Sequence, residues 1–257
     1  MTPFHLTEPE ILKNYETFRN LISELFPSRK VQLDAMYDEL EERVSTIPAS
    51  GTEHYHNCFD GGYVDHVLRV IDFAEKEYNH WKALGLKVDN FTLEELLFAA
   101  AHHDLGKVGL PGDYHPYQPN TSKWQRENQG KFYNTDSNMP FALVQDTSLF
   151  LLQHYGIKCT WQEQLAIRTH DGLYDKANEA YFFSNQLGSK PRTNINQILH
   201  NADMMAARFE FERWAISANK LTFYNEVRPV VTKPKPSTIT DLTKGSNDDI
   251  FKQLFGK

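Results

Sequence analysis

The residues best suited to chemistry in this sequence stand at the end of an apolar segment, where His103 and Asp104 are adjacent. An imidazole nitrogen and a carboxylate oxygen are both good ligands for a divalent metal ion. Two adjacent ligands at a helix end can converge on one ion, and Lys107 follows on the turn, close enough to neutralise a bound phosphate. A helix C-terminus and its turn would also contain such a pair, so a metal site requires further ligands.

Two further candidate ligands lie on apolar helix faces. His66 is followed by valines, and Asp203 shares a face with leucine and alanine residues. A carboxylate on an apolar face is costly to bury unless it is paired or bound to a metal. Taken singly, each residue is better explained as ordinary core structure, a hydrogen-bonded histidine or a carboxylate in an ion pair. Together with the His103-Asp104 pair, they form a four-ligand set drawn from three helices.

The spacing of apolar residues predicts an all-α fold whose helices position these ligands. Capping-box patterns at Thr7, Thr92 and Thr160 mark three helix starts. The expected helices cover a stripe within 11–25, 31–45, the segment that carries His66, 96–103, 141–155, the segment that ends at His170, and a long segment that starts near 193 and carries Asp203.

The chain divides by composition into a helical domain, 1–225, and a C-terminal segment, 226–257. Within the domain, a polar stretch at 110–140 is rich in Pro, Gly, Asn and aromatic residues and is expected to be an inserted loop. Residues 229–246 are rich in Pro, Lys, Ser and Thr, which is typical of a linker. We therefore expect a flexible tail that ends in a short amphipathic segment.

Bulk composition narrows the class of protein. The 257 residues include 40% hydrophobic and 24% charged residues, which is ordinary for a soluble globular protein. The sequence has no apolar run that could span a bilayer and no secretion signal at its start, so we expect a cytoplasmic protein without a membrane partner. Two cysteines exclude a Cys-rich zinc site and do not imply a disulfide framework. The net charge of −7 argues against a broad nucleic-acid-binding surface.

The whole pattern resembles the HD superfamily of metal-dependent phosphohydrolases, whose signature is a His, a distant His-Asp pair and a late Asp. Residues 61–66 (GGYVDH) are similar to the family's Gly-Gly-Leu-x-Glu-His, and 101–107 (AHHDLGK) to its Leu-x-His-Asp-Ile-Gly-Lys. Residues 48–50 and His56 resemble the lead-in of a subgroup related to the HD module of bacterial 3′–5′ exoribonucleases. The resemblance covers about 45–210. It implies an HD-domain helical bundle with metal ligands His66, His103, Asp104 and Asp203.

One departure from the family bears on the number of metal ions. Dinuclear members add two histidines between the His-Asp pair and the last Asp, and His170 matches the second of these. The segment 144–148, where the first should stand, has no histidine. We therefore expect one divalent ion per chain, and the sequence does not distinguish Mn, Fe, Co, Ni, Mg and Zn.

The resemblance implies hydrolysis of phosphate esters of nucleotides or nucleic-acid ends by metal-activated water. Such an enzyme would be a nucleotidase, a nucleotide phosphohydrolase or a phosphodiesterase. Lys107 would stabilise charge on the phosphate, and His170 or His56 would protonate the leaving oxygen. In the inserted stretch, Trp124, Arg126 and Lys131 are the kinds of residue that bind a nucleobase and its phosphates. The alternative for this stretch is a surface loop packed on its own aromatic residues.

The sequence also allows two other functions and one binding partner. The chain resembles, more loosely, the HD-fold di-iron oxygenases, which need a fuller histidine set. A non-catalytic metal-binding module recruited to a partner is the other alternative. Residues 247–257 place four large apolar side chains on one side of a short helix. That segment resembles the C-terminal peptides that bind DNA-polymerase sliding clamps, and packing on the protein's own surface is the competing interpretation.

Overall fold

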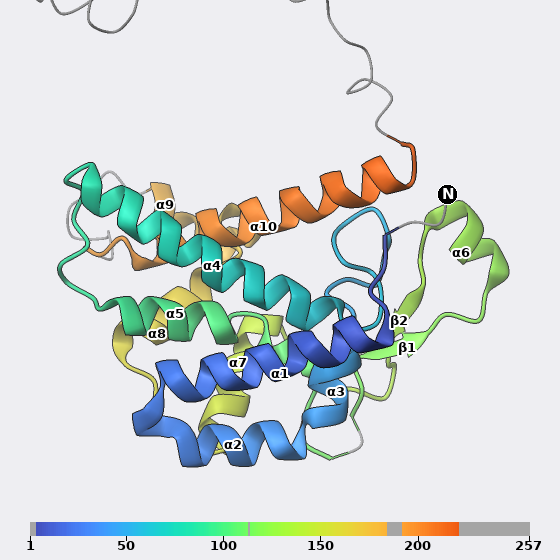
Figure 1. Cartoon of the computed structure of the whole chain (residues 1–257), viewed down its shortest axis with the longest axis horizontal. Coiled ribbons are helices and arrows are strands. Elements are labelled where there is room, and N and C mark those ends of the chain that lie inside the picture. Colours follow the sequence, from blue (N-terminus) through green and yellow to red (C-terminus); the bar gives the residue numbers. More distant parts are fainter. Residues whose placement is uncertain (1–3, 113, 184–191, 221–257) are drawn as a thin grey trace, which may run out of the picture. The chain divides into compact units, whose positions relative to one another are not determined.

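The helical architecture predicted from the sequence is confirmed in a computed structural model that describes residues 4–112, 114–183 and 192–220 (Figure 1). The predicted domain boundary near 225 and the predicted flexible tail lie outside the described residues. The helices are α1 (Glu8–Leu25), α2 (Lys30–Glu39), α3 (Glu41–Thr46), α4 (Gly62–Ala83), α5 (Leu93–His102), α6 (Lys123–Gln129), α7 (Val144–His154), α8 (Trp161–Thr169), α9 (Glu179–Phe183) and α10 (Ile195–Ser217), with 3₁₀ turns η1 (Pro27–Arg29), η2 (Leu105–Val108), η3 (Gly172–Tyr174) and η4 (Lys176–Asn178).

Reciprocal side-chain caps begin the two helices that deliver ligand residues at their far ends. At the start of α5, the Thr92 amide donates to Glu95 at 2.7 Å, and the Glu95 amide donates to the Thr92 hydroxyl at 3.1 Å. Thr160 and Glu163 repeat this arrangement at the start of α8. Each cap satisfies amides that a helix N-terminus leaves without partners. Both capping boxes were predicted correctly from the sequence.

Two segments differ from the prediction. The expected helix over 31–45 is two helices, because the backbone leaves helical geometry at Leu40 (φ −96°, ψ 6°). The stretch 110–140 is more ordered than the predicted loop, since it forms a two-stranded antiparallel sheet, β1 (Tyr117–Pro119) and β2 (Tyr133–Thr135), around α6. Strands of three residues are too short to show a period of two in a sequence.

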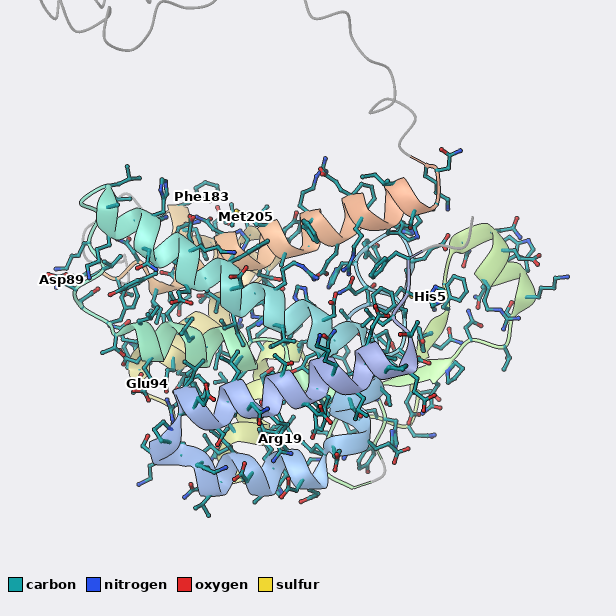
Figure 2. The ribbon with its side chains drawn as sticks, viewed as in Figure 1. His5, Arg19, Asp89, Glu94, Phe183 and Met205 are labelled. Carbon is teal, nitrogen blue, oxygen red and sulfur yellow. The ribbon has the colours of Figure 1, made fainter. Side chains whose placement is uncertain are left out.

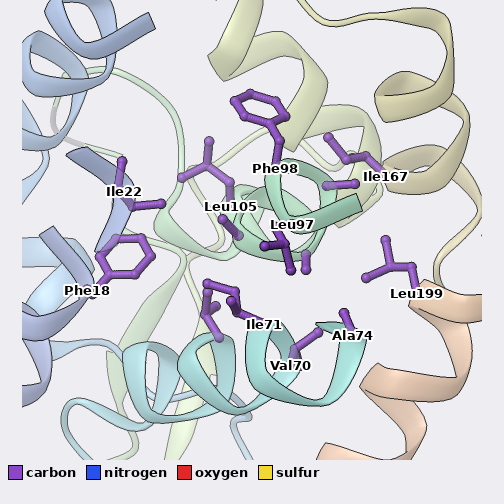
Figure 3. Packing of buried hydrophobic residues seen from close by; sticks show 14 of the residues in the cluster. Phe18, Ile22, Val70, Ile71, Ala74, Leu97, Phe98, Leu105, Ile167 and Leu199 are labelled. Carbon is purple, nitrogen blue, oxygen red and sulfur yellow. The ribbon is translucent and has the colours of Figure 1, made fainter. Parts of the chain in front are cut away.

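The core lies where α1, α4, α5, α8 and α10 meet, and Figure 3 shows side chains from these helices converging there. Helix α5 is buried on all sides beyond its first turn, because Leu96 through His102 are all covered. A helix that is apolar all round belongs in the middle of a bundle. Its last turn therefore presents the His-Asp pair in the interior, between α4, α8 and α10.

A glycine lets α7 approach the turn that follows α5. A Cβ added at Gly106 would lie 2.1 Å from the Val144 carbonyl oxygen, so no larger residue fits without moving α7. The Gly106 amide donates to the Ser148 hydroxyl at 2.7 Å, and this hydroxyl contacts the His103 carbonyl at 3.0 Å. Helix α7 thereby fixes the turn that carries the predicted ligands.

Charged and apolar side chains both lie on the surface of the protein, among them Asp89, Glu94, Phe183 and Met205 (Figure 2). Arg19 on α1 bridges to α2 through Asp38 at 2.8 Å and Asp34 at 3.3 Å. Among the described residues, no helix combines the length and the hydrophobicity needed to cross a bilayer.

His102, the residue before the predicted ligand His103, points into the core. Its Nδ1 donates to the Phe98 carbonyl at 2.7 Å, and its ring lies 4.2 Å from the Phe98 ring. Burial lowers the pKa of His102 to about 3. This position gives His102 a structural role in the core.

We predict that His102 makes the free energy of unfolding fall with acidity. The unfolded ring takes up a proton below its ordinary pKa of about 6.5, and the folded ring resists this until about pH 3. Stability from this residue is complete above about pH 6.5 and is lost as the pH falls towards 3. Urea unfolding with a chelator should show a shallower loss in His102→Leu than in the wild type. Equal slopes in both proteins would contradict the prediction.

Candidate metal centre

The structure brings together the four residues predicted as ligands. His66 lies in the second turn of α4, His103 and Asp104 follow α5, and Asp203 lies in α10. Nε2 of His66 is 3.2 Å from Asp203 Oδ1 and 3.7 Å from Asp104 Oδ2. Nε2 of His103 is 3.4 Å from Asp104 Oδ2 and 3.8 Å from Asp203 Oδ1. Two imidazoles and two carboxylates therefore face one another across the meeting point of three helices.

His170 joins the same cluster from the end of α8. Its Nε2 lies 3.6 Å from Asp104 Oδ1 and 3.5 Å from Asp171 Oδ1. Its ring centroid is 4.8 Å from that of His103. The cluster thus contains three histidines, and the groups His66–His103–Asp104 and His103–His170–Asp203 are each compact enough to hold a metal ion.

Hydrogen bonds fix which ring nitrogen each histidine presents. Nδ1 of His103 lies 2.8 Å from the Ala100 carbonyl, and Nδ1 of His170 lies 2.8 Å from the Ile167 carbonyl. A carbonyl oxygen can only accept, so both Nδ1 atoms carry a proton and donate it. In the neutral rings, Nε2 is then the nitrogen with a lone pair, and it points into the cluster. This is the tautomer that metal-binding histidines use when Nδ1 is anchored.

The cluster leaves buried polar atoms without partners. Within the described part of the chain, Nε2 of His66 and Nε2 of His103 have no hydrogen-bond partner of good geometry, although carboxylate oxygens lie 3.2–3.8 Å away. Both side chains are fully buried, whereas that of Asp203 is 21% exposed. Unpaired buried nitrogens beside carboxylates are costly, and a cation between them would satisfy both. The donor set therefore fits a divalent metal ion, and the buried His/Asp cluster could hold one.

Strong electrostatic coupling accompanies this burial. Burial alone would raise the pKa of Asp104, but Lys107 and His103 hold it well below its usual range. Burial disfavours the charged form of His66, but Glu210 and Asp203 raise its pKa to about 10. The same opposition applies to His170, whose pKa Asp104 and Asp171 raise to about 9. The carboxylates thus stabilise positive charge at the position where the Nε2 atoms converge.

Lys107 lies at the edge of the cluster, as its position on the turn predicted. Its Nζ is 2.6 Å from Asp104 Oδ2, and its side chain is 13% exposed. Burial would lower the pKa of Lys107, but Asp104 raises it above its usual value, so the amine is charged. A permanent cation therefore stands beside the ligands.

His56 lies beside the cluster, with its ring centroid 4.9 Å from that of His66 and the two ring planes tilted by 40°. Burial and the nearby Lys107 hold the pKa of His56 well below its usual range. Its ring is therefore uncharged at neutral pH.

A cavity of about 790 Å³ opens from the cluster. His56, Asp104, Lys107, His170 and Asp203 all line it. Its other walls come from the loop before α4, from α7, from the turn after α8 and from α10, through His54, Tyr55, Leu143, Val144, Gln145, Asp171, Tyr174, His200, Met204, Ala207, Arg208 and Phe211.

The residues predicted to bind substrate in the inserted stretch lie elsewhere. Trp124, on α6, is 61% exposed, and Arg126 donates to the Asn120 carbonyl at 2.5 Å. Lys131 pairs its backbone with Thr52. None of the three lines the cavity, so their role in binding substrate stays a prediction.

Two residues that sequence reasoning missed support the cluster. Glu210 accepts from Nδ1 of His66 at 3.1 Å. His200 contacts the His170 carbonyl through Nδ1 at 2.7 Å, and its ring occupies the space where Gly172 lacks a Cβ. Both lie on α10, His200 three residues before Asp203 and Glu210 seven residues after it. These spacings place all three on one helix face, which was the signal available in the sequence.

The segment 144–148, which lacks the histidine expected for a second metal ion, begins helix α7. Val144 and Gln145 face the cavity there, and the Gln145 amide lies 3.4 Å from Asp175. The number of metal ions per chain stays a prediction from the sequence. No family model, curated protein or solved structure matches this chain, so the interpretation of the site rests on its own residues.

We predict that Asp104→Asn removes metal binding without unfolding the protein. The change is isosteric, but it removes a charge and a ligand oxygen from the cluster, so affinity should fall by more than about 100-fold. Metal content after dialysis and titration with Mn²⁺ measure this, with circular dichroism to check the fold. Asp175→Asn is the matched control, because Asp175 pairs with Arg168 at 3.2 Å outside the cluster. Unchanged metal content in Asp104→Asn would rule out this ligand.

Proposed function

We propose that the protein is a metal-dependent phosphohydrolase of the HD superfamily that cleaves phosphate esters of nucleotides or nucleic-acid ends. The observation that carries the proposal is the convergence of three Nε2 atoms and two carboxylates beside a charged lysine at the base of an open cavity. Two features of the sequence resemble that superfamily. They are the ligand set His66, His103, Asp104 and Asp203, and the motifs at residues 61–66 and 101–107.

The proposed chemistry divides between the ion and the chain. A divalent ion supplies a Lewis acid for a phosphoryl oxygen and lowers the pKa of water. The four ligands would hold the ion at the base of the cavity, where α4, α5 and α10 exclude bulk solvent from one side. Asp104 also pairs with Lys107, so this carboxylate orients the lysine and would serve as a ligand of the ion.

Lys107 supplies the fixed positive charge for the substrate phosphate. It lines the cavity and stays protonated, so its amine can bind the non-bridging oxygens as their charge grows. Substrate phosphate would then compete with Asp104 for the Nζ protons.

Two histidines at the edge of the cluster are candidates for the proton chemistry. His170, if the ion leaves its Nε2 free, suits a donor to the leaving oxygen, since that nitrogen lies 3.6 Å from Asp104 at the cavity. His56 is the other candidate, and its role as a proton donor stays a prediction from the sequence. Both line the same cavity.

The cavity walls favour a small phosphate ester that carries an aromatic base. Tyr55, Tyr174 and Phe211 supply rings on which a nucleobase can stack, and Arg208 supplies a cation. Lys107 and Arg208 are the only lysine or arginine residues among the described residues that line the cavity. Two cations are too few to neutralise the phosphates along a nucleic-acid backbone. The net charge of −7 also argues against such a ligand. A single nucleotide or a short end therefore fits better than a duplex.

A di-iron oxygenase and a recruited binding module remain the alternative proposals. The oxygenase needs further histidine ligands, and α7 offers the cavity Val144 and Gln145 instead. The binding module would need neither Lys107 nor the cavity. Recruitment through 247–257, by a sliding clamp or another partner, is a proposal from the sequence alone, because that segment lies outside the described residues.

We predict that Lys107→Ala keeps its metal and loses turnover. Removing the cation that faces the phosphate should lower kcat by about 10²–10³, as the loss of one donor to a developing oxyanion does elsewhere. Phosphate release from nucleoside monophosphates with Mn²⁺, Co²⁺ or Mg²⁺ measures this. Lys123→Ala on α6 is the control, because Lys123 lies outside the cavity and is largely exposed. Full turnover in Lys107→Ala would remove the lysine from the mechanism.

We predict that the aromatic walls select for a base. Tyr174→Ala should raise KM for a nucleoside monophosphate by the value of one stacking contact, about 1–3 kcal/mol, and leave KM for glycerol phosphate unchanged. The comparison isolates base binding, because both substrates present the same phosphate. An equal loss on both substrates would show that Tyr174 serves the fold of the cavity.

A further inference from the structure

A buried carboxylate stands behind His66, on the side of the ring away from Nε2. Glu210 lies on α10, and its side chain is completely buried. Its Oε2 is 3.1 Å and its Oε1 3.2 Å from Nδ1 of His66. The Arg69 guanidinium donates to Oε1 of the same carboxylate. Glu210 therefore joins the histidine of one helix to an arginine one turn further along that helix.

This contact distinguishes His66 from the other two histidines of the cluster. Nδ1 of His103 and of His170 donate to neutral backbone carbonyls, whereas Nδ1 of His66 donates to a carboxylate. A charged acceptor draws the Nδ1 proton more strongly and raises the basicity of the opposite nitrogen. Nε2 of His66 is consequently the strongest donor of the three towards a metal ion.

A rival role for Glu210 is direct ligation. His56, His66 and Glu210 lie close enough together to hold an ion of their own. Ligation there would require His66 to give up its Nδ1 proton, and it would place a cation beside the Arg69 guanidinium. Both requirements are unfavourable, because the guanidinium already neutralises this carboxylate. The contacts favour a role through His66.

A network of ion pairs holds the Glu210–Arg69 pair in place. Arg69 also contacts Asp65 at 3.0 Å, and Arg213 contacts the same aspartate at 2.7 Å. Arg213 reaches Asn57 at 2.8 Å, the residue next to His56. The network connects α4, α10 and the loop before α4, so the carboxylate has little freedom to turn away from His66.

We propose that Glu210 is a positioning residue that sets the metal affinity of the site through His66. The proposal rests on the metal centre of the proposed function and adds to it the residue that makes one ligand stronger than the others. Glutamine at 210 offers a single acceptor oxygen to two donors, His66 Nδ1 and Arg69, so the histidine loses its charged acceptor. We expect the affinity to fall by about 10–100-fold, the usual effect of removing an outer-shell partner.

The experiment titrates Co²⁺ into the purified full chain and follows binding by calorimetry and by visible absorption of the bound ion. Glu210→Gln should bind 10–100-fold more weakly than the wild type. Glu163→Gln is the matched control, because Glu163 is also a fully buried carboxylate paired with an arginine, Arg29 at 2.8 Å. It lies at the end of α8 remote from His170, so its loss should lower the melting temperature and leave Co²⁺ affinity unchanged.

A double variant, Arg69→Gln/Glu210→Gln, separates positioning from stability. It removes both charges together, so the arginine is not left without its buried glutamate and the fold is spared that cost. Affinity that stays 10–100-fold below the wild type in the double variant supports the proposal. Affinity restored to the wild-type value would overturn it, because the single variant would then have acted through the stranded arginine.

The outcomes also separate this inference from the proposed function. Wild-type affinity in Glu210→Gln overturns the inference alone, since the metal site would remain. A wild-type protein that binds neither Co²⁺ nor Mn²⁺ overturns the proposed function, and the inference with it.

Discussion

The burial of ionisable groups in the middle of an apolar bundle is the constraint on which the rest of this structure depends. Asp104 and Glu210 lie among helices whose inward-facing side chains are mostly apolar. An isolated carboxylate in such surroundings would cost several kcal/mol. Each therefore has a basic partner, Lys107 for Asp104 and Arg69 for Glu210, and the histidines lie between these pairs.

Much of this arrangement could be predicted from the sequence, because it depends on local patterns. Capping boxes and apolar spacing located most of the helices, and the His103-Asp104 pair at a helix end indicated the cluster. Lys107 was found for the same reason, since it lies on the turn that follows. The break at Leu40 and the strands flanking α6 were missed, because a single non-helical residue and a three-residue strand leave no periodic signal.

The residues that could not be predicted act through tertiary contacts. Glu210 looks like one more charged residue near the end of a long helix, and only the packing of α10 on α4 shows that it meets His66. The aromatic residues of 110–140 were the obvious candidates for a nucleobase site by composition. The cavity instead takes its rings from Tyr55, Tyr174 and Phe211, which are scattered along the chain. Composition identifies aromatic residues that are close together in the sequence, but it misses a group of aromatic residues that only folding brings together.

The contact of Gly106 with the Val144 carbonyl has a consequence for how this site can diversify. The missing side chain sets the distance between the His-Asp turn and the first turn of α7, and that turn of α7 forms one wall of the cavity. The position of the His-Asp turn at the base of the cavity is therefore fixed relative to that wall. Changes of specificity would have to come from the opposite walls, the loop before α4 and the exposed face of α10, where side chains can vary without disturbing the ligands. A new substrate preference would therefore evolve through changes on only one side of the cavity.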